Sequence, residues 1–379
     1  MIYLDNAATT FPKPDTVKKA VLQALNRYGA NPGRSGHEMS MQTSQMVFSV
    51  RQQAARFFGL AQEENVIFTQ NCTQATNTVL KGLLQPGDHV VTSCLEHNAV
   101  MRPLYGLQEK GISYTAAKVF PGDDDRTVES FAACIKPNTR LIACTHASNV
   151  WGIKLPIERI GRLAQDRGVE LMVDCAQTAG VVPIQMQQMG IHYLCCAGHK
   201  GLYGPMGTGL LLINSATSLA PLIEGGTGSM SAMLTQPELL PDRFESGTPN
   251  TPGVIGLGAG ISFVNGKGIP RIASHEMGLV RYVYGALSKM NHVLLYTAPP
   301  DETAFVPVLS FNVRDQSSEE TAQYLNQHGI AVRAGLQCAP MAHHYMGTMG
   351  IGAVRISPSA FSTITQMEQF VFWMKQIKK

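Results

Sequence analysis

Short apolar runs alternate with longer amphipathic stretches from about residue 65 to residue 213 of this sequence. The runs are Val66–Phe68, His89–Val91, Leu141–Cys144 and Leu171–Val173. Strands that alternate with helices along a chain form βαβ units, and such units build a mostly parallel sheet with helices on both faces. The alternation therefore predicts an α/β fold with a large, mostly parallel sheet.

Two of the amphipathic stretches carry apolar residues at the spacing of a buried helix face. The first runs from Gln74 to Leu84 and the second from Leu155 to Arg167. The residues predicted to be buried are Ala75, Val79, Leu80 and Leu83 in the first helix, and Ile157, Ile160, Leu163 and Ala164 in the second. We expect both helices to pack on the sheet.

The pattern changes near Gly253, where a glycine-rich run, Gly256–Gly260, is interpreted as a helix start. Helix signals then follow at Arg271–Met290, at Ser318–His328 and after a capping box of Thr363 and Gln366, and strand signals at Pro307–Val313 and Ile330–Arg333. A chain of 379 residues with 44% hydrophobic residues can fill one large core and a smaller one. We predict a large domain of residues 14–255 and a smaller α+β domain of residues 1–13 and 256–379.

Composition argues against several classes of partner and location. The net charge is only +3 and the cations are scattered, so neither nucleic acid nor an anionic membrane is an expected partner. The sequence contains no signal-peptide pattern at its start and no apolar run of about 18 residues, which predicts a cytoplasmic protein. Eight cysteines without CxxC spacing are interpreted as reduced thiols rather than disulfides or metal ligands, so no metal site is predicted.

Polar residues follow several of the predicted strands. Thr73 lies where a strand turns into a helix, and backbone amides at such a helix start bind phosphate, although Thr is also a common N-cap. His97 offers a flat ring that stacks on an aromatic cofactor and exchanges protons near neutral pH. Asn149 offers an amide to a phenolic oxygen or a carboxylate. In open α/β sheets, ligands collect at the carboxyl ends of the strands, so these groups should face one crevice.

Asp174 and Lys200 form the most informative pair. Asp174 directly follows an apolar run, where a carboxylate is costly to bury without a cationic partner, unless it is simply a helix N-cap. A protonated pyridine nitrogen would be such a partner. Lys200, in the run Ala197–Pro205, supplies the amine that a Schiff base requires and the base that then moves an α-proton.

The sequence resembles the class V (fold type I) pyridoxal-phosphate-dependent aminotransferase superfamily, and within it the cysteine desulfurase family. The motifs that carry the resemblance are Tyr3–Thr10, Ala197–Pro205, Glu245–Thr251 and Val354–Ser357. The resemblance implies a fold type I enzyme whose large domain binds pyridoxal 5'-phosphate. The roles that it assigns are covalent attachment for Lys200, ring stacking for His97, a bond to the ring nitrogen for Asp174, a bond to the phenolic oxygen for Gln177, and phosphate binding for Thr73 and His199.

The same resemblance assigns groups to the substrate and to a second subunit. Thr248 is expected to reach the phosphate of the partner subunit, which implies a homodimer. Arg355 is similar to the arginine that clamps the substrate's α-carboxylate, although the residue alone fits a surface ion pair equally well. Arg333 and Asn149 complete the expected substrate contacts.

Cys338 lies in Arg333–Pro340, which resembles a segment of the group II desulfurases, the branch related to selenocysteine lyases. The resemblance implies that its thiolate takes sulfur from the substrate as a persulfide, leaving alanine. Three positions depart from the family. Leu336 and Gln337 stand where group II members commonly have two histidines, Ala197 stands at a common Ser and Cys72 at a frequent Thr.

We expect a desulfurase that converts L-cysteine, or a close analogue, to alanine and passes the sulfur to an acceptor protein or thiol. A selenocysteine lyase, a cysteine-sulfinate desulfinase and a class V transaminase are alternatives within the fold. A non-catalytic scaffold is the alternative outside it, and the joint presence of Lys200, Asp174, His97 and Cys338 argues against that alternative.

Overall fold

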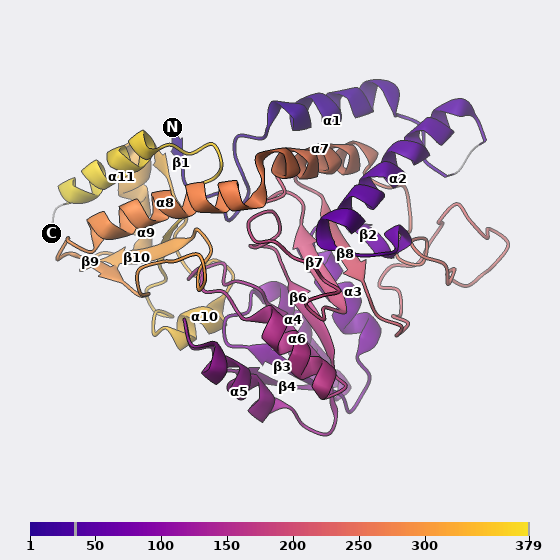
Figure 1. Ribbon diagram of the computed structural model, residues 1–379, viewed down its shortest axis with the longest axis horizontal. Coiled ribbons are helices and arrows are strands. Elements are labelled where there is room, and N and C mark those ends of the chain that lie inside the picture. The colour runs from indigo at the N-terminus through magenta and orange to yellow at the C-terminus, as the bar shows by residue number, and fades with distance from the viewer. Residues whose placement is uncertain (34–35, 378–379) are drawn as a thin grey trace.

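The computed structural model describes residues 1–33 and 36–377, and its central element is a seven-stranded sheet (Figure 1). The strand order is β2-β8-β7-β6-β5-β3-β4. In chain order the strands are β2 (Val66–Thr69), β3 (His89–Ser93), β4 (Ser113–Ala117), β5 (Thr139–Thr145), β6 (Glu170–Asp174), β7 (Tyr193–Ala197) and β8 (Gly209–Ile213).

Five neighbouring strands of this sheet, β4, β3, β5, β6 and β7, pair in parallel. Strand β8 runs antiparallel to both β7 and β2, so β2 points the same way as the parallel strands. The predicted mostly parallel sheet is thereby confirmed. The carboxyl ends of β2, β3, β5 and β6 therefore lie along one edge of the sheet.

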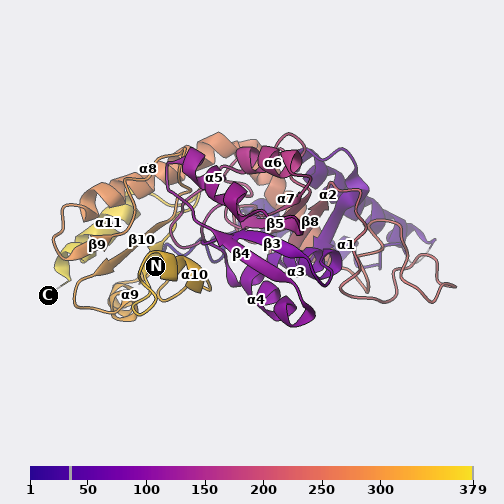
Figure 2. The same cartoon turned by 90° about the horizontal axis from the view of Figure 1, so that it is seen from below.

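Helices cover both faces of the sheet, as predicted (Figure 2). On one face, α3 (Cys72–Leu83) and α4 (Asn98–Leu107) share a core with the sheet. On the other, α2 (Glu38–Phe58), α5 (Asp124–Cys134), α6 (Ile157–Asp166) and α7 (Thr251–Lys267) do so. Of the residues predicted to be buried in α3 and α6, all are buried except Leu163, which is half-buried.

A smaller sheet of order β12-β10-β9 has a core of its own. Its strands are β9 (Val293–Leu295), β10 (Leu309–Val313) and β12 (Val354–Ile356), and α8 (Ile269–Leu287), α9 (Ser318–Gln327) and α11 (Ile364–Gln376) contribute to the same core. The predicted capping box of Thr363 and Gln366 opens α11. Strand β1 (Ile2–Tyr3) pairs with β11 (Ile330–Ala331), which places the start of the chain beside the last third of the sequence.

The remaining elements are α1 (Asp15–Arg27), α10 (Pro340–Tyr345) and the 3-10 turns η1 (Glu63–Asn65) and η2 (Gln108–Lys110). The predicted domain boundary after residue 255 falls inside α7, which packs against α1 and α2. The division of the chain into two domains stays a prediction. Within residues 1–33 and 36–377, no helix is both long enough and apolar enough to cross a membrane.

The interpretation of Gly256–Gly260 as a helix start is wrong. Helix α7 begins five residues earlier, at Thr251, where the Asn250 side chain accepts a hydrogen bond from the Gly253 amide. The glycines serve close packing instead: a Cβ at Gly256 would lie 2.7 Å from both Pro205 and Val21. Small residues inside a helix allow neighbouring chain segments to approach its backbone, and a composition pattern does not distinguish this role from a helix end.

Candidate functional site

Asp174 is the last residue of β6 and its side chain is buried. Its Oδ1 accepts hydrogen bonds from the Ala176 amide at 2.9 Å and from the Cys72 thiol at 3.3 Å. Residues 175–181 form turns, so no helix starts there and the N-cap alternative for Asp174 is wrong. The carboxylate is held at the strand end by an amide and a weak thiol donor, and its burial still calls for a cation.

Lys200 lies in the turn that follows β7 and is half-buried. Burial lowers the pKa of its ammonium group, and the negative charge of Asp174 acts in the opposite direction. A lowered pKa increases the fraction of unprotonated amine near neutral pH, and this is the form that attacks a carbonyl or accepts a proton.

His97 is the N-cap residue of α4, and its Nδ1 accepts a hydrogen bond from the Ala99 amide at 3.0 Å. Burial is the main cause that lowers the pKa of this imidazole, Asp174 raises it, and Lys200 lowers it further. A neutral ring with Nδ1 as an acceptor carries its proton on Nε2. The geometry fixes both the ring orientation and its tautomer.

Thr73 is exposed near the start of α3, but it does not cap the helix. The N-cap is Asn71, whose Oδ1 accepts from the Gln74 amide at 2.8 Å, so the N-cap alternative for Thr73 is wrong. Thr73 instead lines a groove that also contains His97 and Cys338. These three residues come from three separate parts of the sequence.

His199 and Gln177 flank Lys200. The pKa of His199 is lowered to about 4, mainly by burial, so its ring is neutral at physiological pH. The buried Nδ1 of His199 has no hydrogen-bond partner among the described residues. Gln177 and Lys200 line one small cavity, where the Gln177 Nε2 donates to the Ala7 carbonyl at 3.0 Å.

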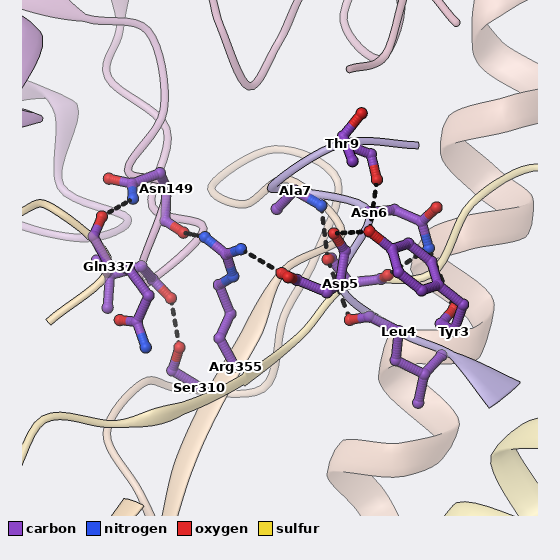
Figure 3. Close-up of polar contacts among 12 residues, drawn as sticks. Tyr3, Leu4, Asp5, Asn6, Ala7, Thr9, Asn149, Ser310, Gln337 and Arg355 are labelled. Atoms are coloured by element: carbon purple, nitrogen blue, oxygen red, sulfur yellow. Dashed lines mark hydrogen bonds and ion pairs between the residues drawn. The ribbon is translucent and has the colours of Figure 1, made fainter. Parts of the chain in front are cut away.

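Arg355 is buried on β12 and lies between Asp5 and Asn149 (Figure 3). One terminal nitrogen donates to Asp5 Oδ1 at 2.7 Å and the other to the Asn149 carbonyl at 2.8 Å. Only 2% of the Arg355 side chain is exposed, so the surface ion-pair alternative is wrong. Its Nε and the Asn149 Oδ1 are buried without partners among the described residues, so both remain available to a ligand.

The two other residues expected at the site are both exposed. Arg333 pairs with Arg355 through backbone hydrogen bonds, and its own side chain is exposed. Thr248 lines a cavity of about 180 Å³ together with Gln70 and Gln74, separate from the groove that contains Cys338. The substrate contact of Arg333 and the action of Thr248 across a dimer stay predictions.

Cys338 occupies a turn between β11 and α10. Among the eight cysteines, all of which the structure describes, Cys338 alone is exposed. Its φ is 58° and that of Gln337 is 41°, so two consecutive non-glycine residues adopt the left-handed conformation. Such a conformation costs free energy and persists only where the surroundings hold it.

Hydrogen bonds from the large-sheet side hold the backbone of this turn. The Asn98 amide donates to the Cys338 carbonyl at 2.8 Å, and Asn149 Nδ2 donates to the Gln337 carbonyl at 2.8 Å. Asn98 follows His97, and Asn149 contacts Arg355, so the turn is bonded directly to neighbours of the predicted cofactor and substrate groups. The thiol is therefore presented in a fixed position relative to the strand ends.

The side chain of Gln337 is buried, and its hydrogen bonds also hold this turn in place. Its Nε2 donates to the Ala353 carbonyl at 2.6 Å, and its Oε1 lies 3.1 Å from His343 Nε2. Because Oε1 only accepts, His343 Nε2 carries the proton and His343 Nδ1 accepts from the Thr348 hydroxyl at 2.8 Å. Sequence reasoning noted Gln337 only as a departure from the family and missed its anchoring role, as it missed Asp5 beside Arg355.

The residues present fit pyridoxal phosphate. A half-buried amine, a buried carboxylate and a neutral imidazole lie close together, because the charge of Asp174 acts on the pKa of both Lys200 and His97. Buried polar atoms on His199, Asn149 and Arg355 have no hydrogen-bond partner among the described residues. No group of three or more His, Cys, Asp or Glu side chains in the described part of the chain is arranged to hold a metal ion.

Comparison with known proteins identifies the family of this chain. Residues 2–370 match the family Aminotransferase class-V. A probable cysteine desulfurase of Methanothermobacter thermautotrophicus is 32% identical over 378 residues, covering 97% of this chain and 92% of that protein. A cysteine desulfurase of Salmonella agona is 33% identical and covers 100% of this chain and 94% of that protein. The apo structure of a cysteine desulfurase from Thermococcus onnurineus NA1 has a TM-score of 0.91 at 31% identity, over 99% of this chain and 94% of that one.

Proposed function

Because the chain belongs to the class-V aminotransferase family, and within it to the cysteine desulfurases, we propose that it stores the sulfur of L-cysteine as a persulfide on Cys338. The observation that carries this proposal is the exposed Cys338 thiol, held in a left-handed turn at a groove that His97 and Thr73 also line. A cysteine kept only for packing would be buried, as most of the others are.

The proposed cofactor is pyridoxal 5'-phosphate, which when bound supplies an electron sink conjugated to the substrate's α-carbon. Lys200 would hold it covalently, Asp174 would hold its ring nitrogen protonated, and His97 would stack on the ring. Gln177 would donate to the phenolic oxygen, while Thr73 and His199 would bind the phosphate. The buried carboxylate of Asp174 supports its part of this assignment, because a cationic ring nitrogen offsets the cost of burying it.

The substrate's carboxylate would bind beside Arg355, whose Nε donor has no partner among the described residues. The Asn149 Oδ1 next to it only accepts, so it would face a donor group of the substrate. Asp5 holds one terminal nitrogen of Arg355 at 2.7 Å, so the guanidinium is already oriented before substrate arrives. Arg333 would assist from the exposed side. The Lys200 amine, whose pKa burial lowers, would then serve as the base that removes the proton from the substrate's α-carbon.

Sulfur transfer to Cys338 balances without an added oxidant. The Cys338 thiolate forms an S–S bond with the substrate's sulfur as the substrate's C–S bond breaks. The electron pair of the broken bond stays with the carbon skeleton, which gains protons and leaves as alanine. The protein retains a persulfide in which Cys338 Sγ is bonded to the transferred sulfur.

A homodimer is part of the proposal, with Thr248 reaching the partner subunit's phosphate site. Large apolar side chains are exposed on α1, on α2 and on the segment 222–239. They include Leu22, Leu25, Phe48, Ile223, Met233 and Leu234. A concentration of exposed apolar surface of this kind is typical of an interface between subunits. A cytoplasmic location, the two-domain division at residue 255 and a sulfur-acceptor protein complete the proposal.

The test is mass spectrometry of the purified holoenzyme after brief exposure to L-cysteine. We expect one added sulfur on Cys338, and alanine and sulfide once a reductant is present. Cys338→Ala should keep the cofactor's absorption and lose at least 90% of the sulfide release. Cys144→Ala is the matched control, because Cys144 is buried in the sheet core.

Unchanged sulfide release by the Cys338→Ala variant would refute the persulfide step. Equal or faster turnover of selenocysteine or cysteine sulfinate by that variant would instead favour the lyase or desulfinase alternatives. Conversion of an added 2-oxo acid to an amino acid would favour the transaminase.

A further inference from the structure

We propose that a cationic groove between α3 and α4 docks an acidic segment of the protein thiol that takes the sulfur from Cys338. This inference rests on the proposed desulfurase function and names the chemistry of its acceptor. The groove is a cavity of about 560 Å³ on the face of the sheet covered by α3 and α4, which lie side by side (Figure 2).

The walls of the groove are single helix faces. Thr73, Asn77 and Lys81 lie four residues apart on α3, so they share one face. Arg102 lies four residues after Asn98 on α4 and shares a face with it. Both helices begin at the edge of the sheet where the parallel strands end. The end of the groove at these helix starts, which we call its inner end, therefore lies beside Cys338.

Positive charge gathers toward the outer part of the groove. Lys81, Arg102 and Lys110 line it, all three are exposed, and none of the described residues that line it is acidic. Glu109 lies next to Lys110 in the sequence but does not line the groove. The whole chain has a net charge of only +3, so this gathering of cations is a local feature and not a reflection of the protein's overall charge.

The dimensions limit what can occupy the groove. Lys81 lies eight positions after Thr73 on α3, so the two residues are about 12 Å apart along the helix at a rise of about 1.5 Å per residue. An extended peptide covers that distance in about four residues. An acceptor whose acidic residues lie about four positions from its reactive cysteine would therefore place its carboxylates beside Lys81 while its thiol is at Cys338.

The chemistry of the inner end favours a protein thiol over other anions. The acceptor's thiolate attacks the outer sulfur of the Cys338 persulfide and forms a new S–S bond. The bond between that sulfur and Cys338 Sγ breaks, its electron pair leaves on Sγ, and Cys338 returns to a thiolate. Nucleic acids and lipid headgroups carry negative charge but lack the thiol that this exchange requires.

The experiment measures sulfur transfer from the holoenzyme to two synthetic peptides of equal length. Each has one cysteine, and three residues beginning four positions away are glutamates in one peptide and glutamines in the other. We expect the kcat/KM for the acidic peptide to be about tenfold higher at low ionic strength, and the preference to disappear near 1 M salt, where charges are screened within about 3 Å.

The triple variant Lys81→Gln, Arg102→Gln, Lys110→Gln should abolish the preference for the acidic peptide. Its alanine production with a small-molecule reductant should match that of the unmodified protein. The matched control is Lys118→Gln, Arg271→Gln, Lys289→Gln, which removes three exposed cations from outside the groove and should keep the preference.

Three outcomes would overturn the inference while leaving the proposed function intact. These are equal transfer to the two peptides, a preference that persists in the triple variant, and a change of oligomeric state in that variant by sedimentation. The last would assign the groove to contact between copies of this chain. Failure of the unmodified protein to form a persulfide or release alanine would instead overturn the proposed function itself.

Discussion

The strand-end residues and the Cys338 turn are held in different ways. Asp174 is the last residue of a strand and His97 caps a helix, so regular backbone hydrogen bonds of the sheet and helices fix both. Cys338 lies in irregular chain, and side chains distant in sequence hold its carbonyl and that of Gln337. The first region owes its geometry to secondary structure and the second to a few specific hydrogen bonds.

Because the two regions are held differently, mutations in them should have different effects. A strand end keeps its position when one side chain changes, because the backbone ladder is unaffected, so mutations there should act on chemistry. The turn carries the cost of two left-handed residues, about 1–3 kcal/mol each, and depends on the Gln337 and Asn149 contacts to offset it. Mutations of those contacts should act on the position of the thiol.

The largest expected effect is that of Asp174→Asn in the strand-end region. A neutral amide would not hold a ring nitrogen protonated, so we expect kcat for alanine formation to fall by about 10²–10³-fold. Stability in urea should change little, because the strand and the Ala176 contact at 2.9 Å can persist with the amide oxygen. Steady-state kinetics and the urea midpoint are the measurements.

The control for that change is Cys72→Ser, which replaces the thiol donor to Asp174 with a hydroxyl and keeps the carboxylate. Its kcat should stay within a few-fold of the unmodified protein. A loss of kcat as large as that of Asp174→Asn would show that the donor, and not the negative charge, matters at this strand end.

The next largest effect is expected for Gln337→Ala in the turn. This change leaves the buried His343 Nε2 and Ala353 carbonyl without partners, at a cost of about 1–3 kcal/mol. Because the Gln337 contacts help to hold the strained turn, we expect persulfide formation on Cys338 to slow about tenfold and the cofactor's absorption to stay unchanged. Stopped-flow mixing with L-cysteine followed by mass spectrometry measures the rate.

Leu336→Ala tests whether the amide itself is responsible. Leu336 is half-buried in the same turn, but its side chain makes no hydrogen bond, so persulfide formation should remain within about twofold. The alkylation rate of Cys338 by iodoacetamide should change in the Gln337 variant alone. Equal rates in both variants would mean that the turn holds itself without Gln337.

The smallest effect concerns pH. Burial lowers the pKa of His343, which lies next to the Cys338 turn, to about 4. The pKa of His146, beside the large sheet, is lowered to about 3, mainly by burial. The unfolded chain binds these protons near pH 6.5, so between about pH 6.5 and 4 it holds more protons than the folded protein. Stability should therefore fall as pH falls, by about 1–2 kcal/mol per histidine from pH 7 to pH 5.

His343→Gln should remove one histidine's share of that loss, measured as the difference between urea midpoints at pH 7 and pH 5. His344→Gln is the matched control, because His344 is exposed next to His343 and should leave the difference unchanged. A protein equally stable at both pH values would contradict the role of the buried histidines.

Local sequence pattern predicted the large sheet and most of its helices, because period and apolar content reflect burial directly. The same pattern misread Gly256–Gly260, since a glycine that admits a neighbouring chain and one that ends a helix have the same composition. The motifs identified Asp174, Lys200 and His97 as candidates. Their charges do act on one another in the folded chain, because the ends of parallel strands meet at one edge.

Periodicity and motifs that are continuous in the chain are enough to predict the α/β class, the family and the candidate residues. Three features are visible only in the folded chain: Arg355 is buried against Asp5, Gln337 holds the thiol turn, and α3 and α4 enclose a cationic groove. Each of these joins residues far apart in the chain or on different elements. Such contacts arise from packing, which no local stretch of sequence encodes.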